Sequence, residues 1–248
     1  MHRRGDPGRH EEEEEEEAAA GPSRRAPSPV LRALLALEGR SVAPALAGLP
    51  AGLLPEARRA LAVWMLEVCR DQGCPEEIFP LAVSYVDRYA RGVPTRQAHL
   101  QLLGAVCVLL ASKLRDPQPL RAEKLSLYTA HAFTARDILD WEPVVLGKLQ
   151  WDLMSVTSQE FLDPILQLLP LPLQEMAPLV KKHTQALVVS WAIEYPLPSQ
   201  RPSVTVAGAI AAAALRLLAP SDSLASEELV GHLASLLHAD AVRACATT

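Results

Sequence analysis

The feature that most constrains this chain is a pair of long apolar runs, Leu102–Ala111 and Val204–Leu215. Wound as a helix, each run is apolar nearly all round, so it offers almost no polar face to solvent. Both runs are shorter than the ~20 residues that span a bilayer. We therefore expect two buried helices in a soluble protein, each surrounded by other elements of the same chain.

The segments around these runs have the spacing of amphipathic helices. In residues 55–70 the apolar side chains recur on one helical face, as at Leu61, Trp64 and Val68. Leu and Ala, which favour helices, are abundant, and few stretches are rich in the residues that favour strands. The sequence therefore predicts an all-α protein.

Capping residues, prolines and glycines set the expected limits of the helices. Ser28 is a candidate N-cap, Thr95 is expected to cap the first apolar helix, and Gly39 is expected to end the first helix. Thr134 and Thr157 each begin a pattern that resembles a capping box. The expected helices cover residues 30–38, 55–70, 76–89, 96–114, 121–130, 135–150, 158–169, 177–193, 203–218 and 226–237.

The chain divides into a tail and two helical groups. Seven consecutive glutamates, Glu11–Glu17, repel one another and have no apolar neighbours to bury, which predicts disorder. The small residues at Gly104 and Gly208 sit in equivalent apolar helices, which indicates two similar bundles in tandem. The expected divisions are a disordered acidic tail at 1–27, a helix and linker at 28–54, and bundles at 55–153 and 154–248.

No pattern in the sequence indicates catalysis. Phosphate-binding glycine loops, zinc-protease motifs and nucleophile elbows are absent from it, and its seven histidines lack metal-ligand spacing. The net charge of −5 comes without a basic stripe, so we expect no nucleic-acid binding. Four cysteines without a CxxC motif suit free thiols in a reducing compartment. The residues alone indicate a helical interaction protein with no cofactor and no metal.

Several segments go further, because in order and register they resemble the helices of a cyclin box, and D-type cyclins in particular. The first three match its opening helix, its central helix, and its last helix with the exit from it; the other two add to the match. The segments are Arg58–Cys69, Leu100–Leu114, Asp140–Leu153, Phe79–Ala82 and Tyr85–Tyr89. The resemblance extends from about Val30 to Cys245.

The resemblance implies two tandem five-helix cyclin folds, the first of which binds a cyclin-dependent kinase. For D-type cyclins it implies kinases 4 and 6 as partners, retinoblastoma-family proteins as substrates, Cip/Kip-type inhibitors as ligands, and a location in the nucleus and cytoplasm. Such a protein performs no chemistry. It biases a two-state element of the kinase, so that the kinase's Lys–Glu ion pair and metal-binding Asp align for phosphoryl transfer.

The resemblance also assigns two sites. Lys113 and Glu142 match the family's kinase-binding lysine and glutamate, although a solvated lysine and a surface glutamate remain the alternative. A substrate and inhibitor docking patch is expected on the opening helix, where Trp64 is alternatively a plain core residue. The patch comprises Ala57, Arg58, Arg59, Ala60, Leu61, Trp64 and Glu67.

The sequence departs from the family pattern at several points. Ala57 and Ala60 are smaller than the usual residues, so we expect weak docking. Pro143 and Pro164 lie inside expected helices and are expected to kink them. The LxCxE segment and the C-terminal threonine segment of D-type cyclins are missing, which predicts slower phosphorylation-dependent turnover. These differences suit a viral cyclin, a splice form or a decaying duplicate.

Two other interpretations stay open at this point. A non-activating adaptor or decoy would bind kinase or inhibitors without supporting activity, and Pro143 beside Glu142 favours it. A relative of transcription factor IIB would share the fold, but the sequence lacks a basic surface and a zinc ribbon.

Overall fold

The computed structural model describes residues 27–42, 53–154, 156–169, 174–194, 201–217 and 229–235. Within these ranges all regular structure is helical, which confirms the predicted fold class. The acidic tail lies outside the described residues, as do most of the linker before residue 53 and the end of the chain after residue 235. The elements are α2 (Pro29–Val42), α3 (Pro55–Asp71), α4 (Ile78–Gly92), a 3₁₀ turn η1 (Gln97–His99), α5 (Leu100–Arg115), α6 (Ala122–Tyr128), α7 (Ala135–Lys148), α8 (Ser158–Leu166), α10 (Ala177–Glu194) and α11 (Pro202–Leu217).

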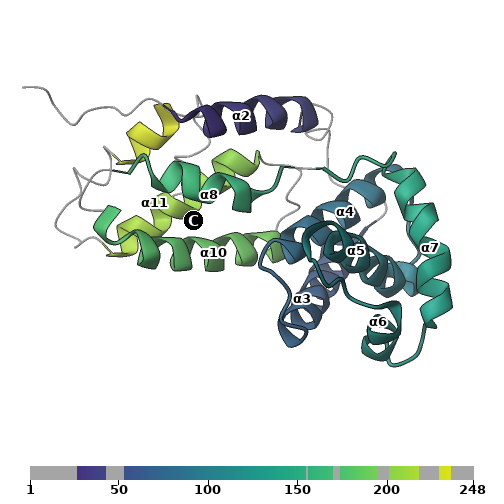
Figure 1. Cartoon of the computed structure of the whole chain (residues 1–248). Coiled ribbons are helices and arrows are strands. Elements are labelled where there is room, and N and C mark those ends of the chain that lie inside the picture. The colour runs from purple at the N-terminus through teal and green to yellow at the C-terminus, as the bar shows by residue number, and fades with distance from the viewer. Residues whose placement is uncertain are drawn as a thin grey trace, which may run out of the picture.

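Helices α3 to α7 form one bundle, with α5 at its centre (Figure 1). The α5 side chains of Leu103, Val106 and Leu109 are at most 1% exposed. At Gly104 a Cβ would lie 2.7 Å from Cδ1 of Leu61, so an alanine there would force the Leu61 side chain to shift. The two helices can therefore pack tightly because α5 carries a small residue at their crossing.

The stretch Gln97–Arg115, which holds α5, is long and apolar enough to cross a membrane by length and composition. It is the only such stretch among the described residues. Of its residues, 67% are buried inside the bundle. Since its neighbours already cover its apolar surface, it is the core helix that the sequence predicts.

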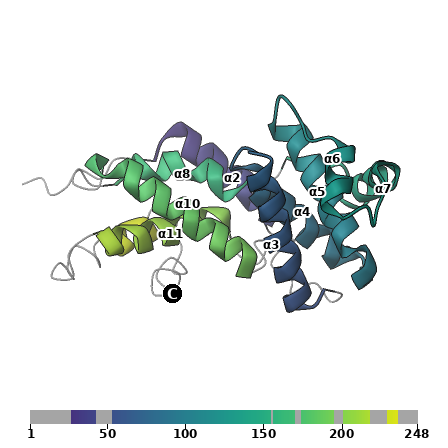
Figure 2. The same cartoon turned by 90° about the horizontal axis from the view of Figure 1, so that it is seen from below.

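A second core lies between α8, α10, α11 and the helical residues 229–235. Phe161 and Ile210 are fully buried there, and α2 adds Leu31 from the far end of the sequence. The two bundles lie side by side, and α10 extends from the second bundle to the N-terminal part of α3 (Figure 2).

Two of the expected caps are confirmed in full and one in part. The Leu31 N–H donates to Ser28 Oγ at 3.1 Å. At the start of α7, the Asp137 N–H donates to Thr134 Oγ1 at 3.1 Å and the Thr134 N–H donates to Asp137 Oδ2 at 2.7 Å, forming a capping box. At the start of α8, the Thr157 N–H donates to Glu160 Oε2 at 2.7 Å, while the buried Thr157 Oγ1 has no hydrogen-bond partner.

Two residues that were expected to mark helix limits do not do so. Thr95 does not cap α5, because its hydroxyl donates to the Val93 carbonyl at 3.2 Å and the 3₁₀ turn η1 leads into the helix instead. Gly39 does not end α2, which continues to Val42. A glycine inside a helix costs only ~1 kcal/mol, and the neighbouring Glu38 is held by two hydrogen bonds from Ser203.

The prolines at 143 and 164 lie within α7 and α8, and both helices continue past them. Pro143 and Leu139, one turn earlier, are both exposed. The missing N–H therefore falls on the solvent side of α7, where a lost hydrogen bond is least costly.

Candidate functional site

The first candidate site is an ion pair that joins the end of α5 to α7. Lys113 Nζ lies 2.6 Å from Glu142 Oε1 and 2.8 Å from Oε2. The Lys113 side chain is 43% exposed and that of Glu142 is 16% exposed. The structure thus brings together two residues that are 29 positions apart in the sequence and that the resemblance assigns to one binding site.

Apolar side chains are exposed on the same two helices. Leu114 follows Lys113 at the end of α5, and Leu139 and Val144 lie within one turn of Glu142 on α7. Their side chains are 36%, 45% and 48% exposed, respectively. An exposed ion pair contributes at most ~1 kcal/mol to folding. Leu139 is three residues before Glu142 and so shares its face of α7, whereas Val144 lies on a different face. A polar pair with an exposed leucine on the same face has the composition of a binding surface.

The residues that the resemblance assigns to a docking patch lie along α3. Arg59, Ala60 and Glu67 are exposed, and Ala57 and Trp64 are half-buried. The Trp64 indole N–H donates to the Tyr128 carbonyl at 3.3 Å, which fixes the ring against α6. Trp64 is therefore partly a core residue and partly exposed, and its role in docking stays a prediction.

Two residues assigned to the patch are buried, which corrects their expected place on the surface. Leu61 packs over Gly104 in the core and is 6% exposed. Arg58 is 5% exposed, because its side chain turns inward. The face that a ligand can reach is consequently limited to Ala57, Arg59, Ala60, Trp64 and Glu67.

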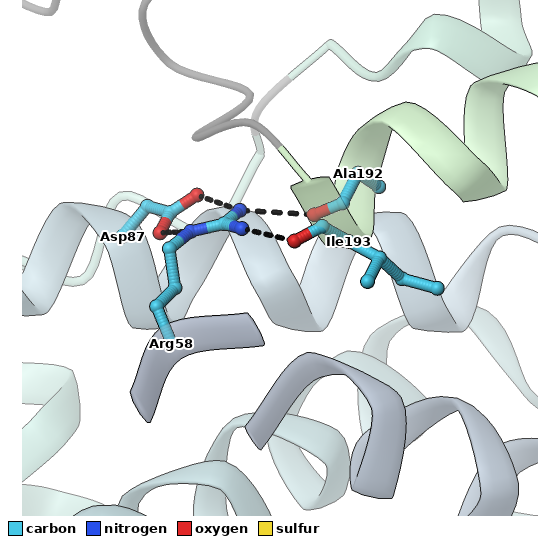
Figure 3. A network of polar contacts seen from close by, with 4 residues as sticks. All are labelled: Arg58, Asp87, Ala192 and Ile193. Atoms are coloured by element: carbon cyan, nitrogen blue, oxygen red, sulfur yellow. Dashed lines mark hydrogen bonds and ion pairs between the residues drawn. The ribbon is translucent and has the colours of Figure 1, made fainter. Parts of the chain in front are cut away.

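Arg58 lies at the centre of a buried polar network between the two bundles (Figure 3). Its Nε and Nη2 donate to the Asp87 carboxylate at 2.7 and 2.9 Å. Its Nη1 donates to the Ile193 carbonyl at 2.8 Å, and Nη2 also donates to the Ala192 carbonyl at 2.9 Å. These carbonyls belong to the last turn of α10, where helix carbonyls lack partners and a cation favours the helix dipole.

The sequence contained a signal for this network that the resemblance obscured. Arg58 is three residues before Leu61, on the face of the helix that the apolar spacing assigns to the core. Asp87 lies in α4 among buried apolar residues. In most proteins a charged residue on a buried face pairs with a residue of opposite charge. The presence of Arg58 and Asp87 on buried faces therefore predicts that they pair with each other.

Among the described residues, no group of three or more His, Cys, Asp or Glu side chains is placed to hold a metal ion.

Comparison with known proteins agrees with this architecture. The sequence model of the cyclin N-terminal domain matches residues 46–154. The chain is 48% identical over 220 residues to G1/S-specific cyclin-D3 of Homo sapiens, covering 87% of this chain and 74% of that protein. It is 44% identical over 195 residues to G1/S-specific cyclin-D2 of Xenopus laevis, covering 77% and 67% respectively.

The fold also matches a solved structure. The viral cyclin from herpesvirus saimiri superposes with a TM-score of 0.72 at 24% identity, covering 87% of this chain and 94% of that one. The paired helical bundles thus have the cyclin architecture.

The chain therefore belongs to the cyclin family, in its D-type branch. As a cyclin it is a non-catalytic regulatory subunit whose partner is a cyclin-dependent kinase, which agrees with the lack of catalytic motifs in its sequence.

Proposed function

We propose that this chain activates a cyclin-dependent kinase of the 4/6 type and thereby drives phosphorylation of retinoblastoma-family proteins and cell-cycle entry in the nucleus and cytoplasm. Its similarity to cyclins D3 and D2 over most of its length supports the choice of kinase. The observation that carries the proposal is the Lys113–Glu142 pair, which lies on the first bundle beside exposed apolar side chains.

The proposed contact works through groups that a partner can reach. Lys113 stands in the last turn of α5, and its ammonium has three donors, of which Glu142 engages some. Backbone carbonyls of a kinase segment can accept the others, while Leu114 and Leu139 supply apolar contact. Binding on this face would hold the kinase's regulatory helix in its active position.

The test is co-purification with kinases 4 and 6, followed by phosphorylation of a retinoblastoma fragment. Lys113→Glu places two carboxylates side by side, and we expect it to abolish both binding and activity. The matched control is Lys181→Glu on the second bundle, which breaks the exposed Lys181–Asp163 pair, at 2.7 Å in the native chain. That variant should bind and activate normally.

A charge exchange separates docking from simple intramolecular pairing. In the double variant Lys113→Glu with Glu142→Lys, the two side chains can still pair with each other. If the pair only stabilises the first bundle, the double variant regains kinase binding. The proposal requires that binding stays lost, because the charges facing the kinase are then inverted.

A second candidate function is binding of the kinase or its inhibitors without activation. The observation that favours it is Pro143, directly after Glu142 in α7, since this proline removes a helical hydrogen bond at the contact. Co-purification with kinase in the absence of phosphorylation of the retinoblastoma fragment would support this function and contradict activation.

A further inference from the structure

The turn between α3 and α4 brings two cysteines together. The Cys74 N–H donates to the Cys69 carbonyl at 2.9 Å, and the Gly73 N–H donates to the Arg70 carbonyl at 3.1 Å. Gly73 has φ +61°, in the left-handed region. These two bonds and this φ define a Schellman motif at the end of α3. In this motif the two residues joined by the bond of greater sequence separation, here Cys69 and Cys74, commonly place their side chains in contact.

In this motif both contact positions are cysteines. The Cys69 thiol is buried and the Cys74 thiol is half-buried. Hydrogen bonding between the two thiols lowers the pKa of Cys74 and, together with burial, raises the pKa of Cys69. Cys74 is thus the more exposed and more nucleophilic sulfur, with the second thiol already against it.

We propose that Cys69 and Cys74 form a reversible dithiol–disulfide pair that is oxidised by hydroperoxides. The turn fixes the two backbone positions close together, and a disulfide needs Cα atoms only about 4.4–6.8 Å apart. This assignment is independent of kinase binding, because neither cysteine belongs to the Lys113–Glu142 site or to the docking patch.

The chemistry balances in two steps. The Cys74 thiolate attacks one oxygen of the hydroperoxide, the O–O bond breaks, and the departing alkoxide or hydroxide takes up a proton. Cys74 is left as a sulfenic acid. The Cys69 sulfur then attacks the Cys74 sulfur, the S–O bond breaks, and hydroxide leaves with the Cys69 proton as water. Two thiols and one hydroperoxide give a disulfide, an alcohol or water, and one water.

Cys107 provides an internal comparison. It lies in the centre of α5 with no exposed surface, and burial raises the pKa of its thiol. A thiol of this kind reacts slowly with peroxide and with alkylating reagents. In the folded chain, Cys107 should therefore stay reduced under conditions that oxidise the pair.

The test treats the full chain with one equivalent of hydrogen peroxide, blocks the remaining thiols with N-ethylmaleimide under denaturing conditions, and digests with trypsin. Because Arg70 separates the cysteines, the disulfide joins the peptides Ala60–Arg70 and Asp71–Arg88. We expect mass spectrometry to detect this joined pair, and to lose it after treatment with dithiothreitol. Recovery of both cysteines only as maleimide adducts would overturn the proposal.

Variants and an unfolded control test the order of events and the role of the fold. In Cys69→Ser, dimedone should capture a sulfenic acid on Cys74, whereas Cys74→Ser should leave Cys69 reduced. The native chain should form the disulfide about tenfold or more faster than the same chain in urea, since the turn holds the sulfurs in contact. Equal rates, or a sulfenic acid on Cys69 in place of Cys74, would contradict the inference.

Discussion

The ionisation of a single carboxylate, that of Asp137, affects the stability of the helix start at α7. The Thr134 hydroxyl and the Thr134 N–H each donate to Asp137 Oδ2 at 2.7 Å. These hydrogen bonds hold the pKa of Asp137 below its ordinary value. Because the folded-state pKa is the lower one, the stabilisation is present above the unfolded value of about 3.9 and is lost as the pH falls through the folded value.

Replacing Thr134 by Ala tests this coupling. The variant removes the side-chain half of the capping box, so we expect a loss of about 1 kcal/mol in the free energy of unfolding and a rise in the pKa of Asp137. Urea unfolding measures the first change and an NMR titration of the carboxyl carbon measures the second. Arg136→Ala, which removes an exposed i,i+4 pair to Asp140, should leave both quantities nearly unchanged. An unchanged pKa in Thr134→Ala would rule out the capping box as its cause.

At the scale of the elements, periodicity alone predicted most helices, because the core face of each helix leaves a repeat in the sequence. The limits were less predictable. Gly39 failed as a stop, since α2 continues to Val42, and the adjacent Glu38 is held by Ser203, a contact between residues 165 positions apart. The pairing of Lys113 with Glu142 and the burial of Arg58 also depend on distant contacts. A local pattern cannot encode such contacts. The resemblance therefore singled out Lys113, Glu142 and Arg58, and the structure shows which groups each of them contacts.

Helix α3 carries the residues of the predicted docking patch, and the small side chains among them predict weak binding of Cip/Kip-type inhibitors. Ala60 is exposed and Ala57 half-buried, so larger side chains have room there. We expect the double variant Ala57→Met with Ala60→Leu to bind a basic, apolar inhibitor peptide about tenfold more tightly, because added methylenes contribute ~0.8 kcal/mol each when buried. Fluorescence anisotropy with a labelled peptide measures the change.

Val63 offers a matched control for that experiment. It also lies on α3 and is 37% exposed, but it is not part of the patch. Val63→Leu should therefore leave peptide affinity unchanged. Tight binding by the native chain, or an equal gain from Val63→Leu, would show that peptide binding does not depend on the apolar size of the patch.

At the scale of the whole molecule, two buried charged residues join segments that are far apart in the sequence. Glu38 on α2 accepts the Ser203 N–H and hydroxyl at the start of α11, both at 2.7 Å, and so caps that helix from outside. Arg58 on α3 caps the C-terminal end of a different helix, because it donates to the last carbonyls of α10. Each places a charge where the helix dipole favours it, and each fixes one element against another.

Removal of Arg58 should consequently loosen the joint between the bundles. In Arg58→Ala, Asp87, which is 0% exposed, loses two hydrogen bonds, and the end of α10 loses two more. Breaking a buried ion pair from one side costs about 3–5 kcal/mol. We expect a loss of that size in urea unfolding, together with faster hydrogen exchange in the last turn of α10.

The adjacent residue separates this effect from a general loss of charge. Arg59 pairs with Glu194 across the same joint at 2.9 Å, but both side chains are largely exposed, so Arg59→Ala should cost at most about 1 kcal/mol. Arg58→Lys keeps the positive charge but loses the planar fork that reaches Asp87 and α10 together, so it should remain strongly destabilising. If Arg58→Lys matched the native chain, charge alone would hold the bundles, and the geometry of the guanidinium would play no part in orienting them.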